Sequence, residues 1–222
     1  MEIRAAFFDL DGTLLDSMGM WSDIDDRFLG KRGIPVPADY QKAVAVMRIH
    51  EAARYTVERF GLPDSPQMVE REWLDMAHYE YASNIQMKPG ALEYLKALRA
   101  QGVRLGVLTS ITRDLFEPVL KRCGAYDLFD AFTSATEAPR GKAYPDAYLI
   151  AADRLNTDPH ACVMYDDMAD ALLGARAAGM TTVGVYDPHA GVGREELAKA
   201  ADWCIDGFDE ELRAWRGRRE AT

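Results

Sequence analysis

Two aspartates one residue apart follow an apolar run near the start of the chain, in the segment FFDLDGTLLDS (residues 7–17). Alternate residues of an extended segment point the same way, so Asp9 and Asp11 can face one substrate. A second acidic pair, Asp166 and Asp167, follows the apolar run CVMY. Carboxylates about 4 Å apart repel by roughly 4 kcal/mol at an effective dielectric near 20. If the two pairs meet, the residues predict a divalent cation that neutralises them.

Oxygen ligands of this kind suit a hard ion, and we expect Mg²⁺ rather than zinc. The four histidines of the chain show no metal-ligand spacing such as HExxH. Each aspartate taken singly is better explained as a turn former or a helix cap. It is their grouping at predicted strand ends that favours a metal site.

Short apolar, strand-forming runs alternate with helical patterns along the chain. The runs cover residues 4–10, 103–109, 131–133, 162–166 and 181–186. This alternation predicts an α/β fold with a Rossmann-like parallel sheet. Ligands collect at the carboxyl ends of such strands. Thr109 and Ser110 end the second run and therefore join the acidic pairs at that edge, and Lys142 follows the third run in a loop.

An insertion separates the first two strands, because roughly ninety residues lie there where a crossover helix needs about a dozen. Apolar side chains recur in it at helical spacing, in two groups: Trp21, Ile24, Phe28 and Leu29, and Val69, Trp73, Met76 and Ala77. The pair Ser65 and Pro66 marks the start of the second helix. We therefore predict an α/β core of residues 1–15 and 88–222 and an inserted small helical domain of residues 16–87.

The sequence resembles the haloacid dehalogenase superfamily in four motifs that occur in order. FFDLDGTLLDS is similar to its DxDGT motif, VLTS (107–110) to its second motif, GKAYPD (141–146) to its lysine-bearing third and YDDMADALLGARAAGM (165–180) to its acidic fourth. The resemblance runs from residue 4 to about residue 186. The inserted helices are similar to the small helical cap of the branch that holds phosphoglycolate phosphatases and β-phosphoglucomutase.

The resemblance implies a Mg²⁺-dependent phosphatase that hydrolyses a small phosphomonoester through an aspartyl-phosphate intermediate. Asp9 would be the nucleophile, and Asp11 would protonate the leaving oxygen and later activate water. Thr109, Ser110 and Lys142 would bind the phosphoryl oxygens and neutralise their charge.

The resemblance also implies the metal ligands. Asp9, Asp167 and the backbone carbonyl of Asp11 would hold Mg²⁺, with Asp170 at most an outer partner. Asp166 is a further candidate, although glutamate is frequent at this position in the family and aspartate is one methylene shorter. Ala143 stands where the family usually has proline after the lysine.

Composition narrows the range of partners. A formal net charge of −10 argues against a nucleic acid or an anionic membrane. Three widely spaced cysteines fit neither a disulfide framework nor a CxxC site. With no signal-peptide pattern and no apolar stretch of membrane-spanning length, we expect a cytoplasmic protein. Its partner should be a small phosphorylated metabolite, and the chain a monomer or weak homodimer.

Two other functions use similar residues. A phosphomutase of the β-phosphoglucomutase type differs only in what accepts the phosphoryl group. A receiver-like signalling module or a non-hydrolytic phosphate-binding module is the alternative of another class, but a receiver has no helical insertion and is phosphorylated at a later strand. Periodicity does not say which helical residues face the substrate; the candidates are Trp21, Asp25, Arg27, Arg48, His50 and Tyr55.

Overall fold

The chain folds into two compact units in a computed structural model that describes residues 3–44, 47 and 49–220. The α/β unit comprises Met1–Met18 and Ile85–Thr222, and the helical unit comprises Gly19–Asn84. The boundaries expected from the sequence, after residue 15 and before residue 88, fall inside the α/β unit. The reason is that the two connecting segments pair with each other, since the Asp16 N–H donates to the Gln86 carbonyl at 3.0 Å.

A parallel sheet forms the centre of the α/β unit. In the described part of the chain it has six strands in the order β3-β2-β1-β4-β5-β6, with every neighbouring pair parallel. The strands are β1 (Ala5–Phe8), β2 (Arg104–Thr109), β3 (Ala131–Ser134), β4 (Cys162–Asp166), β5 (Thr181–Val185) and β6 (Trp203–Ile205). The predicted α/β class with a Rossmann-like parallel sheet is thereby confirmed.

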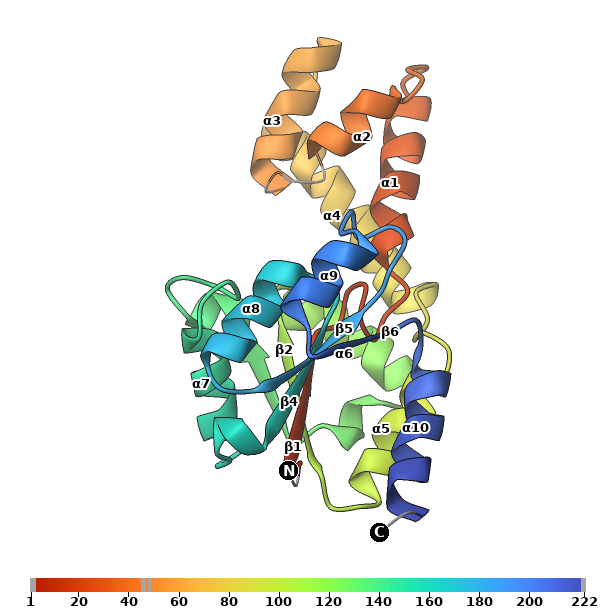
Figure 1. Ribbon diagram of the computed structural model, residues 1–222. Coiled ribbons are helices and arrows are strands. Elements are labelled where there is room, and N and C mark those ends of the chain that lie inside the picture. Colours follow the sequence, from red (N-terminus) through yellow and green to blue (C-terminus); the bar gives the residue numbers. More distant parts are fainter. Residues whose placement is uncertain (1–2, 45–46, 48, 221–222) are drawn as a thin grey trace. The chain divides into compact units, whose positions relative to one another are not determined.

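Helices cover both faces of this sheet (Figure 1). They are α5 (Ala91–Arg99), α6 (Arg113–Arg122), α7 (Asp146–Arg154), α8 (Ala169–Ala177), α9 (Arg194–Ala200) and α10 (Phe208–Glu220), with short 3₁₀ turns η1 (Tyr126–Leu128), η2 (Ala135–Glu137) and η3 (Pro159–Ala161). Successive side chains of a strand point to opposite faces. Phe7 of β1 therefore packs with Tyr148 of α7, whereas Phe8 stacks on Tyr165 and meets Phe208 of α10. Because both faces of β1 are buried, Asp9 emerges from a rigid strand.

Four helices are found in the described residues of the helical unit. They are α1 (Met18–Gly30), α2 (Ala38–Val44), α3 (Ile49–Phe60) and α4 (Pro66–Ser83). The start of α4 is as expected: Pro66 is its first residue, and the Ser65 hydroxyl accepts a hydrogen bond from the Met68 N–H. Phe28 of α1 packs edge-on against Trp73 of α4, with ring centroids 5.5 Å apart. Both side chains are buried, so this aromatic pair belongs to the unit's own core.

The prediction that Trp21 lies on the buried face of α1 was wrong. Trp21 is 37% exposed, and Met20 and Asp25 are buried instead. The Tyr40 hydroxyl donates to Asp25 at 3.4 Å, and burial raises the pKa of that carboxyl to about 6. Among the other residues considered for substrate contact, Arg27 pairs with Glu80, and Arg48 lies outside the described residues.

Two further expectations concern the chain as a whole. Cys123, Cys162 and Cys204 are all free thiols, in agreement with the prediction that the cysteines form no disulfide framework. Within the described ranges, no helix is both long and apolar enough to cross a membrane.

Gly106 offers a test of how tightly β2 packs beside β1. A Cβ at this position would lie 2.5 Å from two atoms of the Phe7 ring, so Gly106→Ala should destabilise the protein by about 1–3 kcal/mol through overpacking. The measurement is the free energy of unfolding from urea denaturation. Gly207→Ala is the matched control, since no atom lies within 4 Å of its Cβ position and the change should be under about 0.5 kcal/mol. Equal costs at the two sites would contradict this packing.

Candidate active site

Three buried carboxylates meet where β1 and β4 end side by side. Asp9 follows β1, and its N–H extends the strand pairing by donating to the Tyr165 carbonyl at 3.0 Å. Asp166 is the last residue of β4, and Asp167 follows it. One oxygen from each of Asp9, Asp166 and Asp167 lies within 4.8 Å of the others. The sequence predicted that four carboxylates, these three and Asp11, gather at the strand ends; we call the three that meet the carboxylate cluster.

A tight turn after β1 packs directly on the cluster. Gly12 has φ of 71°, a left-handed conformation that strains other residues, and a Cβ there would lie 2.2 Å from Asp167 Oδ2. The Thr13 hydroxyl lies 3.4 Å from Asp167 Oδ1 as a donor. Only glycine therefore lets the backbone after Asp11 come this close to Asp167.

Asp11 is oriented separately from the cluster. Its Oδ1 accepts a hydrogen bond from the Ser17 hydroxyl at 2.7 Å, and its side chain is not one of the three that meet. Sequence reasoning gave no role to Ser17 or Thr13, although both lie in the segment FFDLDGTLLDS. Their hydroxyl side chains beside two aspartates were the available signal.

Lys142 supplies positive charge to the cluster. Its Nζ donates to Asp9 Oδ1 at 2.7 Å and forms an ion pair with Asp166 Oδ2 at 2.6 Å, the latter outside hydrogen-bond geometry. The other oxygen of Asp166 accepts the Met168 N–H at 3.0 Å. Asp166 is thus engaged on both oxygens, one of them by the lysine.

The loop that carries Lys142 is fixed by residues that the sequence did not reveal. The Tyr148 hydroxyl lies 2.9 Å from the Lys142 carbonyl oxygen and 2.6 Å from that of Ala171, so its proton is shared between two acceptors. A Cβ on Gly174 would lie 2.1 Å from the Lys142 carbonyl oxygen. Helix α8 can therefore approach this loop closely only because residue 174 has no side chain.

Burial makes the negative charges of the cluster unfavourable. Burial is the main cause that raises the pKa of Asp166 and Asp167, and the neighbouring carboxylates add to the shift. Burial opposes the charge on Lys142 as well, but Asp166 and Asp9 outweigh it and raise the pKa of the ammonium group. Among the described residues, Lys142 is the cation that pairs with these three buried acids, and the donor set suits a hard divalent cation.

Thr109 and Ser110 lie at the same edge of the sheet. Thr109 ends β2, which neighbours β1, and it is buried, with its hydroxyl accepting the Ile111 N–H at 3.4 Å. Ser110 is exposed. Asp170, considered as an outer partner of the metal, is exposed in the first turn of α8.

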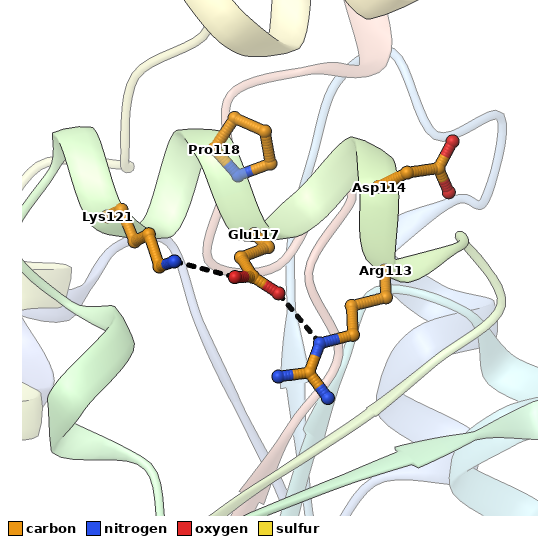
Figure 2. Close-up of a pocket in the computed structure, with 5 residues that line it drawn as sticks. All are labelled: Arg113, Asp114, Glu117, Pro118 and Lys121. Carbon is orange, nitrogen blue, oxygen red and sulfur yellow. Dashed lines mark hydrogen bonds and ion pairs between the residues drawn. The ribbon is translucent and has the colours of Figure 1, made fainter.

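A surface pocket of about 560 Å³ lies along α6 and does not include the cluster (Figure 2). It is lined by Arg113, Asp114, Glu117, Pro118 and Lys121. Glu117 pairs with Arg113 at 2.7 Å and with Lys121 at 2.6 Å. Because these charges satisfy one another at the surface, we place the chemistry at the cluster and not in this pocket.

Comparison with known proteins decides the family. A model of the haloacid dehalogenase-like hydrolases matches residues 3–179. The chain belongs to this family. It is therefore a haloacid dehalogenase-like hydrolase, as the four motifs predicted.

Two relatives of this haloacid dehalogenase-like hydrolase are phosphatases by name. The chain is 29% identical to validoxylamine A 7′-phosphate phosphatase of Streptomyces hygroscopicus subsp. limoneus, over 89% of this chain and 91% of that protein. It is 31% identical to the "Probable pseudouridine-5'-phosphatase" of Drosophila melanogaster, over 93% and 94%.

The fold is shared with a crystal structure of a "putative beta-phosphoglucomutase" from Thermotoga maritima. The TM-score is 0.86, and the match covers 98% of this chain and 99% of that one. The sequences are 23% identical, so this match is evidence for the common fold.

The raised pKa of Asp167 predicts a pH-dependent effect on the metal-free enzyme. A carboxyl group whose folded pKa is raised contributes stability that is complete below its unfolded pKa, near 4, and is lost as pH rises through the folded value. With a chelator present, Asp167→Asn should therefore be increasingly more stable than the wild type as pH rises from about 4 to 9. Urea denaturation at a series of pH values measures this difference.

The control for this experiment is Asp170→Asn, which makes the same chemical change at an exposed position of α8. Its stability relative to the wild type should stay nearly constant over the same range. If Asp167→Asn gave an equally flat difference, the raised pKa would be wrong.

Proposed function

We propose that this enzyme is a Mg²⁺-dependent phosphatase that hydrolyses a small phosphomonoester through a phosphorylated Asp9. The observation that carries the proposal is the meeting of three buried carboxylates with one half-buried lysine at the carboxyl edge of the sheet. Membership of a hydrolase family and relatives named as phosphatases support it.

The cluster fits a magnesium site. Oxygen ligands are the donors that Mg²⁺ prefers, and Lys142 alone leaves an excess of negative charge. Asp9, Asp167 and the backbone carbonyl of Asp11 would hold the ion, with Asp166 as a further ligand. When bound, Mg²⁺ would reduce the repulsion between the carboxylates and an anionic phosphate and stabilise charge on the phosphoryl oxygens.

Asp9 would attack the phosphorus atom. The bond between phosphorus and the leaving oxygen breaks as the bond to an Asp9 oxygen forms, and an acyl phosphate results. Lys142, already bonded to Asp9, would hold the carboxylate in place and neutralise charge on the transferring group. Thr109 would donate its hydroxyl and Ser110 its backbone N–H to the phosphoryl oxygens.

Asp11 would move the protons. It would give its proton to the leaving oxygen in the first half-reaction and take one from the attacking water in the second, which returns it to its starting state. The hydrogen bond from Ser17 would fix the orientation of Asp11 for both transfers.

Asp9 and Asp11 should fail in different ways when each is changed to asparagine. Asp9→Asn should abolish turnover and the hydroxylamine-sensitive phosphoenzyme, because no nucleophile remains. Asp11→Asn should slow turnover by about 10²–10⁴-fold, and less with p-nitrophenyl phosphate, whose leaving group needs no proton. Trapping of labelled phosphate on the protein, beside steady-state rates, measures both effects.

Asp153→Asn, which makes the same change at an exposed position of α7, is the control here, and it should keep wild-type rates. Wild-type turnover by Asp9→Asn would show that the nucleophile has been misassigned.

Phosphate release separates a phosphatase from a phosphomutase. The shared fold with a protein described as a β-phosphoglucomutase makes the mutase the second candidate. After Asp9 is phosphorylated, water and a second substrate hydroxyl compete for the phosphoryl group, and we expect water to react. The test uses a panel of sugar phosphates, nucleotides and phosphoglycolate, each with Mg²⁺ or with excess chelator. One assay measures free phosphate. A second assay, with trace bisphosphate present, measures isomerised sugar phosphate.

Release of phosphate that depends on Mg²⁺ would support the proposal. Efficient isomerisation with little free phosphate would favour the mutase, and full rates of hydrolysis in excess chelator would remove the metal from the mechanism.

A further inference from the structure

A largely buried ion pair outside the carboxylate cluster contacts the turn after β1. Lys88 Nζ lies 2.8 Å from Asp187 Oδ2, and their side chains are only 11% and 3% exposed. The same Nζ donates a hydrogen bond to the carbonyl oxygen of Gly12. The mechanism proposed above gives neither Lys88 nor Asp187 a role.

Lys88 joins segments that are distant in the sequence. Its backbone N–H donates to the Leu14 carbonyl at 2.8 Å, so its backbone and its side chain hold the same turn at two points. Asp187 follows β5, and its second oxygen accepts the His189 N–H at 2.7 Å. The turn that begins at Asp9 is thus fixed to the end of β5 through one lysine.

Stability alone is a poor explanation for this pair. Taking two charges out of water costs about as much as their attraction returns, so a buried pair is often no better than apolar side chains of similar size. The hydrogen bond to Gly12, in contrast, holds a backbone segment whose small displacement would change the geometry beside Asp167. Gly12 follows Asp11 and packs so closely on Asp167 that a Cβ would not fit.

We propose that Lys88, held by Asp187, is a positioning residue that fixes the Gly12 carbonyl and so keeps the turn from Asp11 to Thr13 against Asp167. Without this bond Gly12 loses a contact that holds it against the cluster, and the turn can shift away from Asp167. Such a movement displaces the Asp11 carboxyl and carbonyl and lengthens the 3.4 Å contact between the Thr13 hydroxyl and Asp167. The catalytic meaning of this displacement rests on the proposed function, whereas its effect on metal affinity does not.

Three variants separate positioning from stability. Lys88→Met removes the bond to Gly12 and leaves Asp187 buried without its cation. Asp187→Asn removes the partner of Lys88 but keeps an oxygen for the His189 N–H. The double variant Lys88→Met/Asp187→Asn leaves no unpaired buried charge and also no bond to Gly12. Lys96→Met is the matched control, because Lys96 makes an exposed ion pair with Glu93 in the same unit.

The measurements are the midpoint of thermal unfolding, the Mg²⁺ dissociation constant by calorimetry, and kcat and KM for the best phosphomonoester. Residues that orient metal ligands typically contribute about 10–100-fold to metal affinity or activity. We expect Lys88→Met to lower kcat and weaken Mg²⁺ binding by about this factor, with KM changed less than kcat. Asp187→Asn should have a smaller effect of the same kind, and Lys96→Met should match the wild type.

The double variant gives the decisive result. It should recover thermal stability relative to Lys88→Met, since the unpaired charge is gone, but its Mg²⁺ affinity and kcat should stay low. Recovery of all three quantities would overturn the proposal and leave Lys88 a stabilising residue only. Wild-type affinity and kcat in Lys88→Met would overturn it as well.

If Lys88→Met fails to fold, the double variant and Asp187→Asn still test the proposal. A wild-type protein that releases no phosphate from any substrate would contradict the proposed function, and the Mg²⁺ affinities of the same variants would still report on Lys88.

Discussion

The structure around the site depends on holding like charges together away from water. Asp9, Asp166 and Asp167 are all nearly buried, and burial raises the pKa of the two that follow β4. The residues around the three acids reduce their repulsion or hold them in place. Lys142 brings a cation between two of the acids, and Gly12 and Gly174 let backbone approach where any side chain would collide. The rigidity of β1 and β4, both packed on two faces, keeps the acids from moving apart.

Much of the sheet could be predicted because its strands are short apolar runs that end in polar residues. The runs at residues 103–109 and 162–166 correspond to β2 and β4, within one residue at the ends. Strand β6 was not predicted, since its apolar run of Trp203–Ile205 is short, lies between Asp202 and Asp206, and has only Ile205 buried. In α1, Asp25 is buried through its contact with Tyr40, and periodicity alone assigned Trp21 to that face instead.

Some residues of the site could be identified from the sequence, whereas others can be recognised only from their packing in the fold. Strand-end position placed Asp9, Asp166 and Asp167 together, and the family resemblance added Lys142. The roles of these residues in catalysis stay predictions. Tyr148 and Lys88 could not be found from sequence, because a tyrosine in a helix and a lysine before a turn are ordinary surface residues until the fold brings Lys142 and Gly12 next to them.

The two segments that connect the helical unit to the α/β unit, residues 15–17 and 86–88, pair with each other, and this bears on how such enzymes evolve. Leu15 bridges Met87, and Asp16 bonds to Gln86, so the insertion leaves and re-enters the α/β unit at one place. The sheet therefore requires only that the two ends meet, whatever the length or sequence between them. An insertion joined in this way is an exchangeable module, and its sequence can diverge while the carboxylate cluster and the turn beside it are left unchanged.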